Sequence, residues 1–221
     1  MNPKRNIRLM YAIAFLQGMV FYGPIATLYR QAAGISIFQI TLIESISLIL
    51  CLLLELPWGV VADKIGYRNT MIFCCVLFFL SKIVFWRADG FGAFLLERMM
   101  LSIVIAGMSG VDTGVLYLSA EEGNSQRIFA IYLNLQTAGV LFASFAYSLF
   151  IRENYRLSGF LTVVSYGIAA ILSFGLVEVK GANGTHKINL KELRAIVQSL
   201  VKDKRSVLFL IGVALLNETH Q

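Results

Sequence analysis

Residues 55–68 read Glu-Leu-Pro-Trp-Gly-Val-Val-Ala-Asp-Lys-Ile-Gly-Tyr-Arg and contain the change from membrane-like sequence to a charged turn. The stretch begins inside a long apolar run and ends just before another such run begins. Glu55 lies inside the first run, and Asp63 lies where that run ends. Two apolar runs joined by a short charged link predict two membrane-spanning helices that form a tight hairpin.

The composition of the whole chain also indicates a membrane protein. Among its 221 residues, 57% are hydrophobic and only 14% are charged, whereas a soluble domain carries roughly 25% charged residues. Several apolar runs are roughly 20 residues long, which is the length that crosses a bilayer core as a helix. The alternating pattern typical of membrane β-barrel strands is absent from the sequence. We therefore expect an all-α integral membrane protein whose first partner is the lipid bilayer.

Six apolar runs are long enough to span a membrane, and polar or basic links separate them. They lie at about 9–29, 40–60, 70–87, 93–118, 129–150 and 159–177. Gly23 and Pro24 fall within the first run, where the proline lacks a backbone donor and therefore predicts a kink. We interpret residues 1–178 as one bundle of six helices.

The last part of the chain has a different character. Residues 179–206 form a hydrophilic link in which Asn189 and Glu192 fit a helix-capping pair. Apolar residues then recur at helical spacing, which predicts an amphipathic helix on the inner membrane surface or a simple connector. Residues 207–221 start a further apolar run of about 22 Å as a helix, too short to span. We interpret it as the truncated start of a seventh helix, so the chain resembles the front half of a longer protein.

Basic residues predict the orientation of the bundle. If the N-terminus is cytoplasmic, the inner ends and links of the six-helix unit hold Lys4, Arg5, Arg8, Lys64, Arg68 and Arg127. The outer links then hold Arg30, Arg87, Arg152 and Arg156. The positive-inside rule favours this orientation, with the link at 179–206 also cytoplasmic. It accounts for the net charge of +6, so we expect no nucleic-acid partner.

Ionisable residues inside apolar runs are costly in lipid and are therefore candidates for function. At about 100° per residue, Glu44 and Glu55 share one narrow stripe of the second run, so both should face the bundle or a water-filled cavity. Arg98 and Asp112 lie on one side of the fourth run but are about 21 Å apart along its axis. Each is expected to pair with another helix, or Arg98 to extend to the outer headgroups.

Other polar residues of the runs admit two interpretations. Gln17 in the first run, and Tyr132 and Gln136 in the fifth, could line a transport cavity or make ordinary helix contacts. Lys82 lies near the outer end of its run, and we expect it to extend to the headgroups. Glu97 is expected to be interfacial.

The fourth run also contains a possible catalytic motif. Gly107, Gly110 and Gly114 line one side and are expected to let helices pack closely. Yet Gly107-Met-Ser109-Gly110 resembles the nucleophile motif of rhomboid proteases. A serine nucleophile needs a nearby base, and neither histidine of the chain lies in the sixth run, where that resemblance requires one. We expect no enzyme, and because the cysteines show no metal-ligand spacing we expect no metal or cofactor.

Residues 59–68 resemble the Gly-x-x-x-Asp-Arg/Lys-x-Gly-x-Arg/Lys loop of major facilitator transporters, and they occupy the same place between the second and third spans. Residues 55–59, 109–117 and 34–39 resemble further segments of a bacterial branch of that superfamily. The chain departs from the antiporter branches, since its fifth run lacks their proline and Ser102 stands where they have glycine. The resemblance implies a 3+3 inverted repeat with alternating access. It also implies a gating loop made of Gly59, Asp63, Lys64, Gly66 and Arg68.

The function implied by this resemblance is secondary transport of a small solute across a bacterial inner membrane, with proton-coupled efflux as a more specific form. Proton coupling is expected through Glu55 or Asp112. The wider set of candidates for coupling or substrate contact is Glu55, Asp112, Arg98, Glu44, Gln17, Tyr132 and Gln136. The alternative is a half-transporter that cannot transport alone or that serves as an assembly partner. In both cases the missing partner is a C-terminal six-helix half.

Overall fold

The computed structural model of the protein describes residues 3–120, 124–151 and 154–179. The predicted amphipathic helix in the 179–206 link and the predicted seventh run at 207–221 lie outside the described residues. Everything below refers to the described part of the chain.

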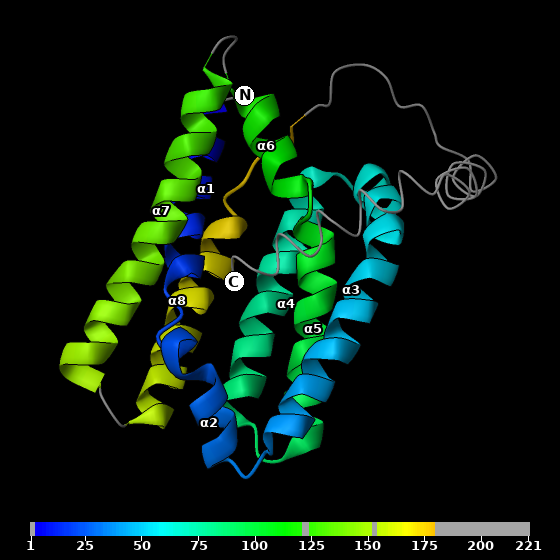
Figure 1. Ribbon diagram of the computed structural model, residues 1–221. Coiled ribbons are helices and arrows are strands. Elements are labelled where there is room, and N and C mark those ends of the chain that lie inside the picture. The colour runs from blue at the N-terminus through cyan, green and yellow to red at the C-terminus, as the bar shows by residue number, and fades with distance from the viewer. Residues whose placement is uncertain (1–2, 121–123, 152–153, 180–221) are drawn as a thin grey trace. The chain divides into compact units, whose positions relative to one another are not determined.

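Six spans of helix are long and apolar enough to cross a membrane, which confirms the predicted all-α membrane fold with six spans (Figure 1). The elements are α1 (Pro3–Gly18), η1 (Gly23–Ile25), α2 (Ala26–Ala32), α3 (Ile37–Ile65), α4 (Tyr67–Arg87), α5 (Phe91–Met108), α6 (Val111–Ser119), α7 (Ser125–Ala146), η2 (Tyr147–Ile151) and α8 (Tyr155–Ser173).

Two of the spans are each divided into two helices. The first is interrupted between α1 and α2, where Pro24 lies in the first turn of η1, so the predicted kink is a full break. The fourth run, predicted as continuous over about 93–118, is divided between α5 and α6 at Gly110. The φ of Gly110 is 81°, a left-handed conformation that glycine adopts without steric cost.

The spans pack as two groups of three. In one group α1 packs on α7 and α8, and in the other α5 packs on α3 and α4. Contacts of α4 with α8 and of α1 with α6 join the groups. The first and fourth spans thus each pack against the later spans of the opposite half of the sequence. This packing of each half against spans of the other half is compatible with the predicted 3+3 inverted repeat, which stays a prediction.

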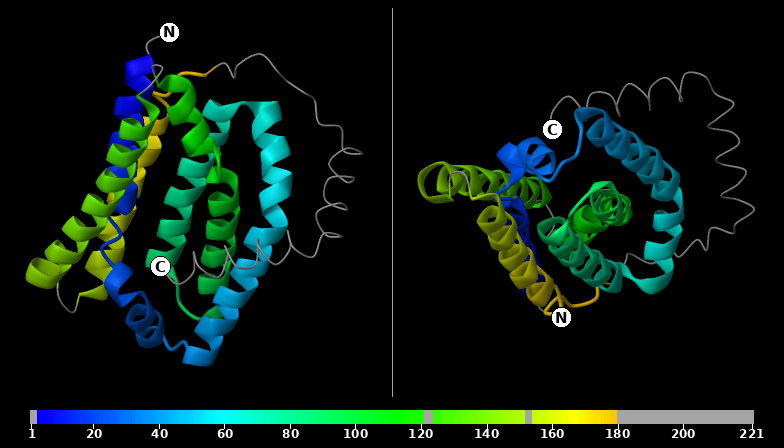
Figure 2. Two further views of the ribbon diagram at one scale, coloured as in Figure 1. Left: turned by 45° about the horizontal axis from the view of Figure 1, so that its top comes forward. Right: turned by 90° about the horizontal axis from the view of Figure 1, so that it is seen from below.

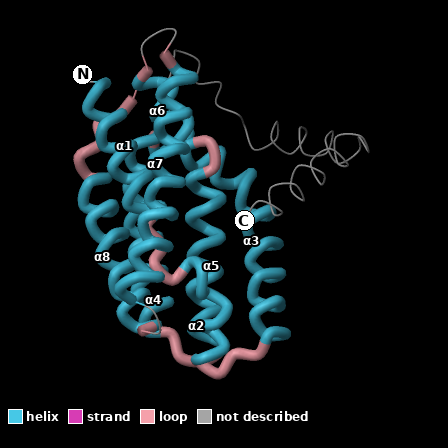
Figure 3. The backbone as a smooth tube through the Cα atoms, turned by 60° about the vertical axis from the view of Figure 1, so that its left-hand side comes forward, coloured by secondary structure: helices cyan, strands magenta, loops and turns pink. Residues whose placement is uncertain are grey.

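The bundle has two ends, where the loops join the helices, and two edges. We call the end at which α2 meets α3 and α4 meets α5 the link end, and the end at which α3 meets α4 the turn end; loops gather at both ends (Figure 3). The helices α3 and α7 lie at opposite edges of the bundle (Figures 1 and 2). A buried apolar cluster fills the link end and includes Tyr22, Tyr29, Phe85 and Phe94.

Candidate functional site

The turn between α3 and α4 consists of Gly66 alone. Its φ of 86° and ψ of 153° lie in a region that is almost confined to glycine. A Cβ atom at Gly66 would lie 2.9 Å from Oε2 of Glu178, and the backbone N–H of Arg68 donates to Oε1 of Glu178 at 3.4 Å. The Glu178 carboxylate therefore lies at the N-terminus of α4, where the helix dipole favours an anion.

Arg68 makes the reciprocal contact at the other helix. Its Nε donates to the carbonyl oxygen of Leu176 at 2.6 Å, and its Nη2 donates to that of Phe174 at 3.4 Å. These carbonyls follow the last turn of α8, where the helix dipole favours a cation. Arg68 and Glu178 thus tie the start of α4 to the end of α8, inside this bundle.

The remaining residues of the predicted gating loop are less constrained. Lys64 is exposed, and a Cβ atom at Gly59 would meet open space. Asp63 belongs to α3, but its side chain lies outside the described part of the structure. The gating role of these residues stays a prediction. Sequence reasoning missed Glu178, because it follows the sixth run without any local pattern that relates it to the loop.

Five ionisable residues from four helices gather inside the link end. Four of them lie about 8–10 Å from the nearest end of their own helix at 1.5 Å per residue, and Arg30 lies close to the end of α2. We call this set the charged cluster: Arg30, Glu44, Lys82, Glu97 and Arg98. Arg30 Nη1 donates to Glu44 Oε1 at 2.7 Å, and Arg98 Nε donates to Glu44 Oε2 at 2.6 Å. Arg98 and Glu44, which were predicted separately, therefore form a pair that joins α5 to α3.

The predictions that Lys82 reaches the headgroups and that Glu97 is interfacial are both wrong. Lys82 is 4% exposed and Glu97 is 1% exposed. The Nζ of Lys82 donates to the hydroxyl of Tyr22 at 3.0 Å and lies 4.9 Å from the ring centre of Phe78 and 5.1 Å from that of Tyr166. Cation–π and hydroxyl contacts thus hold the ammonium inside the bundle instead of at the membrane surface.

Asp112 lies in the first turn of α6, directly after the break in the fourth span. Its Oδ1 accepts from the backbone N–H of Thr113 at 2.6 Å, and its Oδ2 accepts from the hydroxyl of Tyr132 at 3.3 Å. An anion in the first turn is favoured by the helix dipole. Two of the predicted candidates, Asp112 and Tyr132, are therefore brought together across α6 and α7.

Gln17 lies in the interior, where α1 crosses α7. Its Nε2 donates to Sγ of Cys75 at 3.5 Å, and its backbone carbonyl accepts from the hydroxyl of Tyr166 at 2.5 Å. A Cβ atom at the next residue, Gly18, would collide with the backbone carbonyl oxygen of Gln136. The structure thus gives Gln17 a helix-contact role at a close crossing.

Glu55 and the side chain of Gln136 are exposed on the two edge helices. Within the described residues, neither side chain has a hydrogen bond or an ion pair. The structure does not bring them together with the charged cluster, although Glu44 and Glu55 share a helix face as predicted from their spacing.

The three glycines of the fourth span differ in role. A Cβ atom at Gly107 would lie 2.8 Å from Sγ of Cys74, and one at Gly114 would lie 2.9 Å from the ring of Tyr67. The packing prediction is confirmed for these two. It is wrong for Gly110, where a Cβ atom would meet no atom within 4 Å, because this glycine supplies the positive φ of the break. The adjacent Ser109 is exposed, and both histidines of the chain lie outside the described residues.

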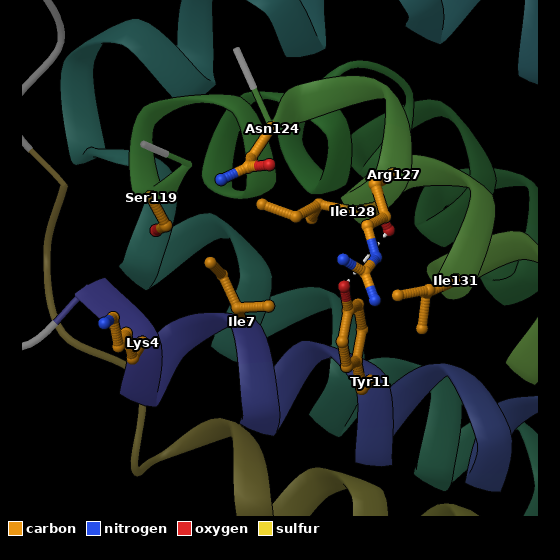
Figure 4. Close-up of a pocket in the computed structure, with 8 residues that line it drawn as sticks. All are labelled: Lys4, Ile7, Tyr11, Ser119, Asn124, Arg127, Ile128 and Ile131. Carbon is orange, nitrogen blue, oxygen red and sulfur yellow. Dashed lines mark hydrogen bonds between the residues drawn. The ribbon is translucent and has the colours of Figure 1, made fainter. Parts of the chain in front are cut away.

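A pocket of about 270 Å³ opens at the turn end between α1, α6 and α7 (Figure 4). Its lining residues are Lys4, Ile7, Tyr11, Ser119, Asn124, Arg127, Ile128 and Ile131. The hydroxyl of Tyr11 donates to the carbonyl oxygen of Ile128 at 3.4 Å. None of the residues predicted for transport lines this pocket.

Comparison with known proteins places the chain in one family. The family model described as Major Facilitator Superfamily matches residues 8–217, which is nearly the whole chain and includes every candidate residue discussed above. No curated protein matches the chain.

Proposed function

Because the chain belongs to the Major Facilitator Superfamily, a family of membrane transporters, we propose that it forms six helices of a secondary active transporter that moves a small solute by alternating access. The match over residues 8–217 carries this proposal, and it confirms the resemblance of the chain to the superfamily. Members of the superfamily are transporters and not enzymes, so membership argues against the protease alternative at Ser109.

The burial of the spans supports a transport path along the edge helices. In the most apolar part of α3 and of the α7 span, 17% of the residues are buried, against 39–44% in the other four spans. The face of α3 that points away from the bundle carries exposed Leu42, Ile49 and Leu53, as expected for contact with lipid. The helices α3 and α7 therefore have surface that is not covered by this bundle. Part of it can contact lipid, and the rest can contact another partner.

Glu55 and Gln136 lie on the flanks of these helices, near the packed side. At about 100° per residue, Glu55 is roughly 20° from Glu44 around α3, and Gln136 is roughly 40° from the buried Tyr132 around α7. An exposed carboxylate or amide at this depth is costly against hydrocarbon. A water-filled path or a polar partner on the same side of the bundle removes that cost, and this supports both residues as candidates for solute or proton contact.

The proposed transport path lies between this bundle and a second six-helix bundle, since transporters of this type bind substrate between two halves. We further propose that the N-terminus faces the cytoplasm of a bacterial cell, on the basis of the Lys and Arg distribution. The half-transporter alternative predicts that residues 1–221 alone move no solute until the second bundle is supplied.

A solute screen in proteoliposomes tests this function. The complete transporter is reconstituted, and solute flux is measured with and without an imposed pH gradient. We expect flux of at least one small solute that responds to the gradient, and loss of that response in Glu55→Gln but not in the matched variant Ser45→Ala on the outward side of α3. No flux above empty vesicles for any solute would contradict transport, and gradient-independent flux would contradict proton coupling alone.

A further inference from the structure

Two buried polar atoms of the charged cluster have no hydrogen-bond partner within the described residues. Within the described residues, the buried side-chain nitrogen and oxygen atoms that lack a partner are Nε of Arg30 and Oε2 of Glu97. One is a donor without an acceptor and the other is an acceptor without a donor. An unpaired buried group of a charged side chain is expensive, so both atoms need an explanation.

The arginine is bound to the other carboxylate. Nη2 of Arg30 is 3.9 Å from Oε2 of Glu97, which is too long for a hydrogen bond, whereas its Nη1 is 2.7 Å from Glu44. Glu44 also pairs with Arg98 and its side chain is 36% exposed, against 2% for Glu97. The more exposed carboxylate thus has two arginines, and the fully buried carboxylate has no close one.

The charges around Glu97 come from each neighbouring helix. They are Arg30 from α2, Glu44 from α3, Lys82 from α4 and Arg98 from α5 itself. The ammonium of Lys82 already donates to Tyr22, and Arg98 donates to Glu44. No described donor therefore reaches Oε2 of Glu97, although cations surround it. A carboxylate in this position lacks the hydrogen bonds that would stabilise its charge, and the neutral carboxylic acid is less costly to bury than an unpaired charge.

We propose that Glu97 is a proton-binding site and that Arg30 changes carboxylate partner with the charge of Glu97. When Glu97 carries a proton, Arg30 stays on Glu44, as the structure shows it. When the O–H bond breaks, the proton passes to water at the link end and the electron pair stays on the carboxylate. Arg30 then closes the 3.9 Å gap, and its Nε or Nη2 donates to Oε2 of Glu97.

The exchange has a mechanical consequence because Arg30 belongs to α2. This short helix is separated from α1 by the break at η1, and Gly34, with a φ of 84°, follows it in the link to α3. The Arg30 guanidinium anchors α2 to the rest of the link end. The charge of Glu97 therefore determines where α2 is held. As a step in transport this inference rests on the proposed function, but proton binding and helix position can each be measured without a solute.

Infrared difference spectroscopy between acid and alkaline pH tests the proton site. The full chain is placed in lipid nanodiscs, and the C=O stretching band of protonated carboxyls is recorded in H₂O and in D₂O. We expect a buried-carboxyl band that disappears in Glu97→Gln and persists in Glu44→Gln. An unchanged band in Glu97→Gln would overturn the proposal. The measurement needs no transport, so its failure is distinguishable from failure of the proposed function.

The position of α2 is measured by the distance between two spin labels. They are attached at Leu28→Cys on α2 and Leu96→Cys on α5, two exposed positions, with Cys51 replaced by serine. We expect the distance distribution to change with pH in the otherwise native chain, and to remain at its acid form in Glu97→Gln. Arg30→Lys keeps the charge but loses Nε, so we expect it to keep the infrared band and lose the distance change. The exchange of Arg30 between the two carboxylates would be contradicted if the label-to-label distance in the native chain did not change with pH. It would also be contradicted if the distance still changed with pH in Glu97→Gln.

Discussion

The two ends of the bundle hold charged side chains in opposite ways. At the turn end, Arg68 binds backbone carbonyls at the end of α8 and Glu178 binds a backbone N–H at the start of α4. The helix dipoles favour both of these charges. At the link end, Glu44 binds both Arg30 and Arg98, whereas Oε2 of Glu97 has no hydrogen-bond partner within the described residues. The turn end is therefore a fixed joint, whereas the link end offers Arg30 a choice of two carboxylates.

The largest effect is expected from Glu44→Ala at the link end. It removes the carboxylate that holds two arginines, one of them buried. Breaking a buried pair costs roughly 3–5 kcal/mol, and because Glu44 is a third exposed we expect about 2–3 kcal/mol loss in the free energy of unfolding. Denaturation in mixed micelles measures it. Glu55→Ala removes an acid on the same helix that has no ion pair within the described residues, and it should cost below about 0.5 kcal/mol. Equal losses in the two variants would show that the charged cluster adds no stability.

A smaller loss is expected from Gly66→Ala at the turn end. The alanine must adopt a positive φ, and its Cβ would press on the Glu178 carboxylate. Such backbone strain costs about 1–3 kcal/mol, so we expect about 2 kcal/mol by the same denaturation measurement. The matched variant is Gly59→Ala, which lies within α3 and meets open space; it should be neutral or slightly stabilising. A neutral Gly66→Ala would refute the fixed joint.

Arg68→Ala should loosen the same joint by a lesser amount. It removes two charge-assisted hydrogen bonds to carbonyls after α8, worth about 1.5 kcal/mol after solvent competition. Hydrogen–deuterium exchange should show faster exchange at the end of α8 and at the start of α4. Lys64→Ala removes a basic residue that is exposed in the same stretch, and exchange there should not change. If both variants behave alike, Arg68 is not a helix tie.

The smallest effect is expected from Ser102→Ala, one turn beyond Arg98. Its hydroxyl lies 2.7 Å from that of Ser47 on α3, and a hydrogen bond between membrane helices contributes about 0.6 kcal/mol. Ser45→Ala is the control, because this hydroxyl donates only within its own helix. A loss of stability well above that of Ser45→Ala would mean that the Ser47–Ser102 pair also stabilises the neighbouring charged cluster.

What the sequence could predict follows from the range of each interaction. Apolar runs report the six spans directly, and the Gly66 turn is encoded in neighbouring residues. The helical spacing of the second run places Glu44 on the same face as Glu55, and the cost of charge in lipid marks Arg98 as a functional candidate. Their pairing, the burial of Glu97 and Lys82, and the contact of Glu178 with Arg68 all depend on how distant segments pack. No local pattern contains that information, and for this reason the sequence alone places Arg30 in an outer link.

The breaks in the first and fourth spans were only partly predictable. Pro24 predicts a kink or break in the helix because proline lacks a backbone N–H donor. Gly110 is one of three similarly spaced glycines, and their spacing alone suggests packing. Only the backbone conformation distinguishes the glycine that ends α5 from the two that contact Cys74 and Tyr67.

The central claim is that the packed-side flanks of the edge helices line a water-filled transport path. Cysteine labelling with a membrane-impermeant thiol reagent tests it most directly, in the complete transporter with Cys51 replaced by serine. Gln136→Cys and Phe145→Cys lie on α7 roughly 180° apart at about 100° per residue, and both native side chains are exposed. We expect the cysteine at 136 to react and the cysteine at 145, which faces lipid, to stay unlabelled. Labelling at 145 with none at 136, or at neither position, would contradict it.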